Sequence, residues 1–521
     1  MDREKRTIAG GVLDPDGAVE RLTATDRTAS GTMSTWGTTL HSIDPLIADL
    51  VDRERRRQEE KVILIASESR PHRAVLEALA SPFTSLYAEG YPSRWMRGLP
   101  LDALTDVERQ LAVHRRRGNR RFYQGTELAD IVECVAERRA AACFASDACS
   151  AERIHANVQP LSGSAANLAV FEALLEPGDT IMAMTLTEGG HLTHGSPYSV
   201  SGKRHHAIGY GTDPRTGRLD YGEMRRLAEA HRPKLLIGGF TSYPWRPDWY
   251  RFREIADEIG ALLLADIAHA AGLVVGDAYP NPVGIADVAT FTTHKTLCGP
   301  RGAVILSTDE RIARRIDRAV FPGLQGGPHV NKMAAIAVAM HLARTAAFAD
   351  LQRKVVANAA HLGDALVRRG LTLAYGGTDT HMLLVDLRPL GLTGKLAARV
   401  LDSAGLVCNR NVIPGDRDGA DAHGIRLGTP WVTQRGMGRD EMDALAEVVA
   451  RVLFALASCA ARGDDEEASD GELATAVDRA AERVRAVIPG RSTIGNPRVE
   501  RTENLILTGP NRLGHSSTCT T

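Results

Sequence analysis

One lysine of the chain, Lys295, lies among residues that could assist amine chemistry. It follows Thr292 and His294 in the sequence TFTTHKTLCGPRG, and no arginine or glutamate stands near it before Arg301. A probable strand at 286–290 comes just before it, so the lysine is expected at the mouth of a sheet. A lysine removed from water is a good nucleophile toward an aldehyde, with which it forms a Schiff base.

Polar residues also follow apolar runs elsewhere in the sequence. Ser162, Gly163 and Ser164 open an expected helix, where free backbone N–H groups, two hydroxyls and the helix dipole suit a phosphate. A plain N-terminal cap with a glycine turn explains the same three residues. Asp266 ends an apolar run, and it could pair with a protonated ring nitrogen or serve as a cap or ion-pair partner.

Three histidines and one arginine complete the set of candidates. His191 and His194 lie in the glycine-rich sequence TEGGHLTHGS, where a single histidine is more often structural than catalytic, and His269 follows Asp266 closely. Arg426 stands between glycines and could clamp a carboxylate or form a structural ion pair. Because no carboxylate accompanies the histidines at a metal-ligand spacing, a metal hydrolase is disfavoured and no metal is expected.

These residues are weak indications one by one, but together they favour a single cofactor. Pyridoxal phosphate needs a phosphate cradle, an aspartate at its pyridinium nitrogen, a flat imidazole on its ring and a Schiff-base lysine. Lys295 is therefore predicted to hold pyridoxal phosphate, and Thr292 and His294 are predicted to help position the phosphate and the lysine.

Composition excludes several other classes of protein. The 521 residues are 43% hydrophobic and 24% charged with a formal net charge of −1, which gives no case for nucleic acid or an anionic membrane as the main partner. The seven cysteines are scattered without a CxxC pair, as in a reduced intracellular chain. No apolar run approaches the ~18 residues of a membrane span, so a cytoplasmic protein is expected.

The hydrophobic pattern predicts an α/β domain with a mostly parallel sheet, followed by a smaller α+β domain. Expected strands lie at 180–184, 234–240, 261–266, 286–290 and 303–307, and expected helices at 165–175 and 248–261. The expected divisions are a disordered extension at 1–40, a cofactor-binding large domain with an N-terminal arm at 41–345, an insertion at about 93–119, a small C-terminal domain at 346–458, and a linker with an amphipathic helix and a polar tail at 459–521.

Nine segments between about 40 and 455 resemble, in order, the motifs of the serine hydroxymethyltransferase family. They are LIASESRPHRAVLEAL, YAEGYP, VQPLSGSAAN, GGHLTHGS, ADIAHAAGLV, TTHKTLCGPRG, GLQGGP, LVDLRPLGLTGK and GIRLGTPWVTQRGM. The resemblance implies a fold-type-I (aspartate aminotransferase-like) enzyme that depends on pyridoxal 5′-phosphate. It also implies a homodimer or higher homo-oligomer with shared active sites.

The resemblance assigns roles around the cofactor. It places Ser162, Gly163, Ser164 and His294 at the phosphate together with Gly326 and Gly327 of the partner subunit, His191 on the ring, Asp266 at the ring nitrogen, His269 and Thr241 near the 3′-oxygen, and Thr292 beside Lys295.

The resemblance also assigns roles around the amino acid, whose β-hydroxy form would be split by retro-aldol cleavage into a glycine unit and an aldehyde. Ser67 and Arg426 would take the carboxylate with Tyr123 nearby. Tyr87 and Glu89 would handle protons beside the catalytic Lys295 and His191, and Arg301 would support the site.

Several segments depart from the family pattern. An insertion, SRWMRGLPLDALTDVERQLAVHRRRGN, precedes RFYQG; Leu101, Leu104, Val107 and Leu111 predict a helix there, and Thr105 with Glu108 has the spacing of a capping box. Its basic end is either a solvated helix face or a cationic rim near the substrate mouth. Phe122, Gln124 and Ser69 replace the usual tyrosine, glycine and asparagine, and RDGADAHGIR shortens the loop that touches folate.

These departures favour an L-threonine transaldolase of the kind found in nucleoside-antibiotic pathways. Such an enzyme releases acetaldehyde from threonine and moves the glycine unit to an aldehyde such as uridine 5′-aldehyde. The alternative is serine hydroxymethyltransferase itself, since Leu192 and Asn411 match folate-contacting positions. A non-catalytic regulatory subunit is a remote third possibility, because both Lys295 and Asp266 are present.

Overall fold

The computed structural model describes residues 38–118, 120–417, 419, 422–462 and 466–489. The expected disordered extension and the polar tail therefore lie largely outside the described residues. The chain divides into two compact units, one ending at Lys61 and the other beginning at Val62, and each is described by itself.

The first unit consists of two helices with an apolar face. Helix α2 (Leu40–Ile43) is followed by α3 (Pro45–Glu60), which begins after Asp44 because the Asp44 carboxylate accepts a hydrogen bond from Ile47 N at 3.0 Å. Apolar side chains recur on these helices at intervals of three and four residues, and they are 44–68% exposed: Leu40, Ile43, Leu46, Ile47, Leu50 and Val51.

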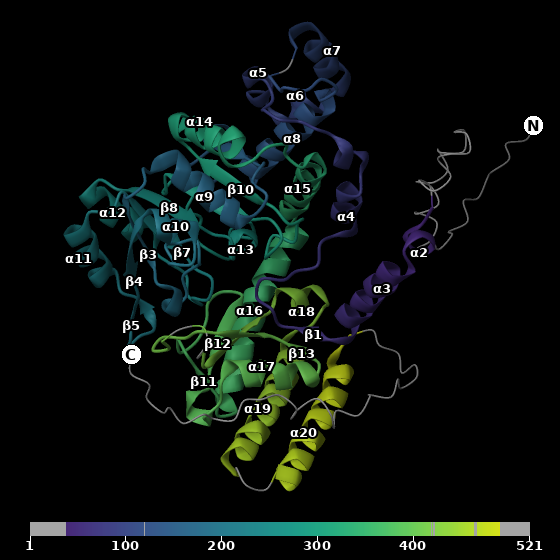
Figure 1. Cartoon of the computed structure of the whole chain (residues 1–521), viewed down its shortest axis with the longest axis vertical. Helices are drawn as coiled ribbons and strands as arrows, with labels where there is room; N and C mark the ends of the chain where they lie inside the picture. Colours follow the sequence, from purple (N-terminus) through teal and green to yellow (C-terminus); the bar gives the residue numbers. More distant parts are fainter. Residues whose placement is uncertain (1–37, 119, 418, 420–421, 463–465, 490–521) are drawn as a thin grey trace, which may run out of the picture. The chain divides into compact units, whose positions relative to one another are not determined.

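A seven-stranded sheet forms the centre of the second unit (Figure 1). Its order is β2 (His155–Asn157), β10 (Ala303–Ser307), β9 (Val288–Thr292), β8 (Leu262–Asp266), β7 (Leu235–Gly239), β3 (Thr180–Met184) and β4 (His206–Tyr210). Only β10 runs antiparallel to its neighbours. The predicted α/β class with a mostly parallel sheet is confirmed.

Helices cover both faces of this sheet, which explains its continuous apolar strands. In β3, Ile181 and Ala183 pack with α9 (Gly163–Leu174) and α14 (Glu310–Arg318). Met182 and Met184 point to the opposite face, into the core formed with α8, α11, α12 and α15. The bounds of the other helices of this domain are α4 (Arg73–Leu79), α8 (Glu127–Phe144), α10 (Val200–Arg204), α11 (Tyr221–His231), α12 (Trp249–Ile259), α13 (Ala271–Val275) and α15 (Val330–Ala343).

Strand boundaries agree with the sequence prediction at two positions and shift at another. Strands β3 and β10 have the predicted bounds, whereas β9 starts two residues later than 286–290. The prediction for β9 was wrong because the strand extends through the polar residues Thr290 and Thr292, whose hydroxyls are hydrogen-bonded rather than solvated. The shift brings the end of β9 closer to Lys295.

A second, four-stranded antiparallel sheet follows in the C-terminal part. Its order is β11 (Thr372–Leu373), β12 (Met382–Asp386), β15 (Gly424–Gly428) and β14 (Asn409–Asn411), packed with α16 (Ala346–Arg368), α17 (Gly394–Ser403), α18 (Pro430–Gln434), α19 (Arg439–Arg462) and α20 (Glu466–Val487). Two short pairs, β1 (Val62–Ile63) with β13 (Leu406–Val407) and β5 (Thr212–Asp213) with β6 (Arg218–Leu219), complete the strands of the described residues.

Helices α19 and α20 share one core. Leu473, Val477 and Val484 of α20 are buried in it, so this core extends beyond residue 458. By length and composition alone α19 could span a membrane, but Leu445 and Val449 are fully buried among the side chains of this domain. Packing within the domain therefore explains the apolar character of α19.

The insertion folds as three short helices rather than the single predicted helix. These are α5 (Arg94–Arg97), α6 (Leu101–Thr105) and α7 (Val107–Arg117). The backbone leaves the helical region at Asp106, whose carboxylate caps α7 by accepting from Arg109 N at 3.1 Å. The predicted capping box was wrong, since the Thr105 hydroxyl instead donates to Asp102 O.

Candidate active site

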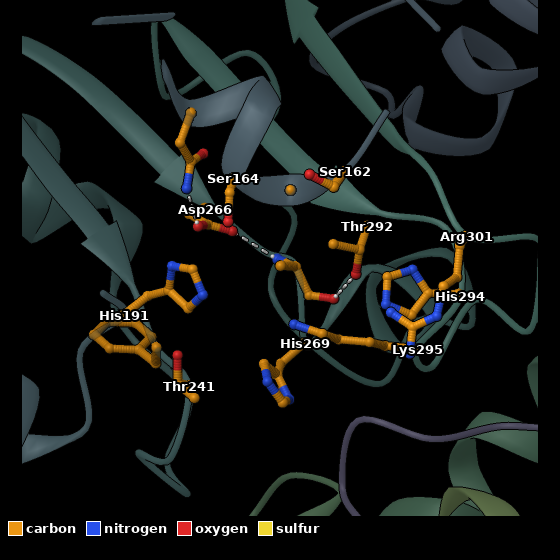
Figure 2. A pocket seen from close by; sticks show the side chains of 14 residues that line it. Ser162, Ser164, His191, Thr241, Asp266, His269, Thr292, His294, Lys295 and Arg301 are labelled. Atoms are coloured by element: carbon orange, nitrogen blue, oxygen red, sulfur yellow. Dashed lines mark hydrogen bonds between the residues drawn. The ribbon is translucent and has the colours of Figure 1, made fainter. Parts of the chain in front are cut away.

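A cavity of about 230 Å³ opens where strands β8 and β9 end, and Figure 2 shows the side chains that line it. The lining residues are Ser162, Gly163, Ser164, Asn167, His191, Phe240, Thr241, Asp266, Ala268, His269, Thr292, His294, Lys295 and Arg301. Only Asn167, Phe240 and Ala268 were not singled out in the sequence. Residues up to 139 positions apart thus meet at one edge of the sheet, as expected for parallel strands.

One side of the cavity is built to receive an anion. Ser162 caps helix α9, and its Oγ accepts a weak hydrogen bond from Ala165 N at 3.4 Å. A Cβ at Gly163 would lie 2.8 Å from Thr292 Cγ2, so glycine allows the start of the helix to approach β9. His294 Nδ1 is buried without a hydrogen-bond partner among the described residues. A helix N-terminus and an unsatisfied ring nitrogen together suit a phosphate.

The charge near His294 supports the same conclusion. Burial, followed by the neighbouring Lys295 and Arg301, lowers the pKa of His294 to about 4. Two cations, Lys295 and Arg301, thus act on His294. A bound phosphate would relieve this repulsion and raise that pKa.

Asp266 stands on the other side of the cavity in a network of hydrogen bonds. Its Oδ2 accepts from Asn167 Nδ2 at 2.8 Å and from His194 Nε2 at 2.9 Å, and its Oδ1 accepts from Ala268 N at 3.0 Å. Asn167 Oδ1 in turn accepts from the Thr290 hydroxyl at 2.8 Å. Burial raises the pKa of Asp266, but the hydrogen bonds outweigh it and hold the pKa well below its usual range. Asp266 is therefore a buried carboxylate suited to a protonated ring nitrogen.

Lys295 is half-buried and lines the same cavity. Burial lowers its pKa to about 8, with Asp266 opposing that shift and Arg426 and Arg301 adding to it. Within the described residues, no carboxylate lies within ion-pair distance of its ammonium group. A useful fraction of the amine is thus neutral near pH 8, which is the form that attacks an aldehyde.

His191 is held in one tautomer. Its Nδ1 accepts from Thr193 N at 3.2 Å and contacts the Thr193 hydroxyl at 2.8 Å, while Asn167 Nδ2 donates to that hydroxyl. Burial lowers the pKa of His191 to about 4, so the ring is neutral. A neutral, fixed imidazole can stack on an aromatic cofactor.

His269 contacts a histidine from the second sheet. Its Nδ1 lies 3.3 Å from Nε2 of His381, which directly precedes β12, and the rings stack with centroids 5.5 Å apart. Burial lowers the pKa of His381 to about 3 and that of His269 well below its usual range. Sequence patterns did not predict this pair, because its members are 112 residues apart.

Arg426 on β15 is a buried cation that lies near the cavity without lining it. Its Nη1 donates to Thr241 O at 2.7 Å and its Nε to Asn409 Oδ1 at 3.1 Å, but no carboxylate among the described residues pairs with it. Burial lowers its pKa to about 10. An arginine with this unmet charge suits the carboxylate of an amino acid. Ser67 is half-buried and does not line the cavity.

A second lysine supports the approach to the phosphate cradle. Lys332 on α15 is buried, and its Nζ donates to the carbonyls of Val158, Gln159 and Pro160 at 3.1, 2.8 and 2.9 Å. These three residues lead into Ser162. Burial lowers the pKa of Lys332 to about 7.

Five of the predicted site residues gather elsewhere, and we call them the surface cluster: Tyr87, Glu89, Tyr123, Gly326 and Gly327. The rings of Tyr87 and Tyr123 lie 4.7 Å apart, and a Cβ at Gly326 would lie 3.2 Å from Glu89 Oε1. Tyr87 is 57% exposed and Tyr123 is 41% exposed. None of the five lines the cavity of Lys295, so one chain holds the predicted site as two separate groups.

The cavity fits pyridoxal phosphate on features of the chain itself. The gap at Gly163, the unsatisfied His294 nitrogen, the ionised Asp266 and the low-pKa Lys295 meet the demands of its phosphate, ring nitrogen and aldehyde. Together with the sheet, these features define a fold-type-I pyridoxal-phosphate enzyme.

Comparisons with known proteins agree with this class. The family model described as serine hydroxymethyltransferase matches residues 40–119 and 115–449. A serine hydroxymethyltransferase of Acidothermus cellulolyticus is 46% identical over 457 residues, covering 88% of this chain and 97% of that protein. The protein of the same name from Sorangium cellulosum is 48% identical over 408 residues (78% and 88%), and that from Paramagnetospirillum magneticum is 46% identical over 422 residues (81% and 91%).

The chain belongs to the serine hydroxymethyltransferase family. Enzymes of this family are transferases that depend on pyridoxal phosphate, and this protein is one of them.

Proposed function

We propose that the protein interconverts serine and glycine, with tetrahydrofolate accepting the one-carbon unit. The observation that carries this proposal is the cavity in which Lys295, Asp266 and His191 converge, in a chain 46–48% identical to proteins named serine hydroxymethyltransferase. This reverses the order in which the sequence ranked the two candidate reactions.

Each residue of the cavity has a role in this proposal. Pyridoxal phosphate, bound covalently through Lys295, supplies an electron sink for cleavage of the Cα–Cβ bond. Asp266 keeps the ring nitrogen protonated, and His191 orients the ring. Arg426 holds the substrate carboxylate, because its buried guanidinium lacks a charge partner in the described part of the chain. Ser67 assists Arg426.

The surface cluster is proposed to complete the cavity of a second copy of the chain. Glu89 and Tyr87 would move protons at the substrate hydroxyl, and Gly326 and Gly327 would reach the phosphate. Support comes from the exposure of Tyr87 and Gly326 and from the absence of all four residues from the cavity of their own chain. The apolar face of α2 and α3, exposed in one chain, supports a homodimer in which a partner covers it.

A second candidate is an L-threonine transaldolase. In that reaction threonine loses acetaldehyde, and its glycine unit adds to a second aldehyde such as uridine 5′-aldehyde. The specific observation is a set of hydrogen bonds between described residues at the two ends of the short loop before Arg426. The Asp416 carboxylate accepts from Ile413 N, from His423 N and, at 2.8 Å, from His423 Nδ1. These polar groups are then not available to a folate.

One experiment separates the two reactions. The purified, cofactor-loaded protein is given L-serine with tetrahydrofolate, and separately L-threonine with and without uridine 5′-aldehyde in the absence of folate. Glycine formed only with serine and folate supports hydroxymethyl transfer. Acetaldehyde release that requires the second aldehyde, with a glycyl adduct seen by mass spectrometry, would replace it with the transaldolase.

We also propose that the protein acts in the cytoplasm on these small molecules. Five described cysteines are free thiols, in keeping with a reducing compartment: Cys134, Cys143, Cys149, Cys298 and Cys408.

A further inference from the structure

Two arginines that each form two ion pairs attach the insertion to the large domain. Arg97 forms ion pairs with Glu137 at 2.8 Å and Asp317 at 2.5 Å. Arg121, just after the insertion, has a completely buried side chain that pairs with Asp130 at 2.5 Å and Glu133 at 2.6 Å. These two arginines are structural.

Apolar contacts add to this attachment. Met96 and Leu104 of the insertion are buried against Ile131 and Cys134 of α8. The insertion is therefore a packed part of the domain, and the residues at its surface have defined positions.

Four other arginines of the same segment are unlike Arg97 and Arg121, and we call them the arginine patch: Arg115, Arg116, Arg117 and Arg120. All four are exposed, and none has a carboxylate of the described residues within ion-pair distance. The guanidinium of Arg117 lies over the Trp95 ring, 5.2 Å from its centroid. The patch thus concentrates positive charge on a chain whose net charge is −1.

The helix dipole does not account for the whole patch. Cations in the last turn of α7 stabilise that helix by about 0.3–1 kcal/mol. Arg120, however, lies beyond the end of α7 at Arg117, outside the last turn in which the dipole acts. The remaining charge is unexplained by the fold.

The patch is continuous with the surface cluster. A Cβ at Gly90 would lie 3.1 Å from Arg120 O, and Phe122 N donates to Glu89 O at 3.0 Å. Arg121 Nη1 donates to the carbonyls of Ala88 and Gly90 at 2.7 and 3.1 Å. Hydrogen bonds therefore join the segment next to the arginine patch to the backbone at Glu89 and on both sides of it.

We propose that the arginine patch binds an anionic group, phosphate or carboxylate, at the far end of the second substrate. Guanidinium groups bind both anions through paired hydrogen bonds, and exposed arginines lacking partners are free to do so. The proposal rests on the proposed function, because it places the surface cluster at the mouth of a neighbouring cavity through which the second substrate enters.

Binding is tested on the cofactor-loaded enzyme with two probes, tripolyphosphate and a glutamate trimer, read through tryptophan fluorescence. The patch variant is R115Q/R116Q/R120Q, which keeps Arg117 on Trp95. The charge-matched control is R225Q/R226Q/R251Q on α11 and α12. Helix α11 contacts edge strand β4, whereas α7 packs on α8, which contacts the opposite edge strand β2. Figure 1 shows α7 and α11 lying apart.

The expected result is saturable binding that weakens about tenfold in the patch variant and remains unchanged in the control, with strong dependence on salt. Tighter binding of tripolyphosphate would identify phosphate as the group, and tighter binding of the trimer would identify carboxylates. Equal binding by wild type, patch variant and control, or none by wild type, overturns the proposal.

Steady-state kinetics then separates this proposal from the proposed function. With serine, the KM for tetrahydrofolate carrying three glutamates should rise in the patch variant, while kcat and the KM for the form with one glutamate stay unchanged. If neither the wild type nor any variant shows turnover with folate or aldehyde, the proposed function fails. The binding measurements still decide whether the arginine patch binds anions. An equal rise in KM for both folates contradicts the proposal that the arginine patch binds the far end of the second substrate.

Discussion

The Lys295 cavity and the surface cluster hold residues predicted for one reaction, yet their physical states differ. In the cavity, buried groups fix one another: Asp266 is charged because His194 and Asn167 donate to it, and Lys295 is partly neutral because burial lowers its pKa. In the surface cluster, two exposed tyrosine rings and a glutamate surround glycines. The cavity is prepared within one chain, whereas the surface cluster lies outside that cavity and is proposed to act on another chain.

The largest effect is expected from Lys295→Ala, which removes the one lysine among the described residues that line the cavity, and with it the amine that would bond covalently to the cofactor. Cleavage of β-hydroxy amino acids should fall to background. The absorbance of bound cofactor should also change after dialysis. Turnover near that of the wild type would refute the assignment of Lys295.

Glu89→Gln should reduce turnover by about 10²–10⁴-fold, because the surface cluster loses its acid–base group while the cavity stays intact. The absorbance of bound cofactor should match that of the wild type. Both results are measured on one preparation, so a loss of cofactor binding would place Glu89 in the cavity instead.

Mixing the Glu89→Gln and Lys295→Ala variants tests directly whether the surface cluster of one subunit completes the cavity of another. Subunits with Glu89→Gln keep Lys295, and subunits with Lys295→Ala keep Glu89, so a mixed dimer has one complete site. Activity should therefore reappear after subunit exchange. A mixture of Lys295→Ala with Asp266→Asn is the matched control and should stay inactive, since both changes damage the cavity. No recovery in the first mixture contradicts shared sites.

Asp266→Asn should lower turnover by about a hundredfold while leaving some cofactor bound. The amide preserves the shape of the side chain but removes the negative charge that favours a protonated ring nitrogen. The check is turnover together with a pH titration of the bound cofactor's absorbance. An unchanged titration would mean that Asp266 does not face the ring.

The smallest effect concerns pH. Burial lowers the pKa of Lys295 to about 8, so the neutral amine is scarce below that value and dominant above it. Loading of the cofactor onto the apoprotein should therefore accelerate as pH rises toward about 8 and then level off. A stopped-flow series across this range measures it, and a rate still rising toward pH 10 would indicate an unburied lysine.

Sequence patterns predicted the elements whose signals are local. The apolar runs of β3 and β10 gave their bounds, whereas the break at Asp106 was missed because apolar spacing continues across it. His194, Asn167 and His381 received no role because their partners lie 72, 99 and 112 residues away. Pairings between distant strands depend on side-chain packing, which periodicity does not report.

The three-carbonyl contact of Lys332 has a consequence for chemical labelling. Lys332 has a lower pKa than Lys295, about 7 against about 8, so at a given pH a larger fraction of its amine is neutral. Its Nζ, however, donates hydrogen bonds to three carbonyl oxygens, and Lys332 does not line the cavity. Aldehyde probes followed by borohydride reduction should therefore mark Lys295 in the folded protein and spare Lys332. In this chain the reactivity of a lysine follows from the space in front of its nitrogen rather than from its acidity.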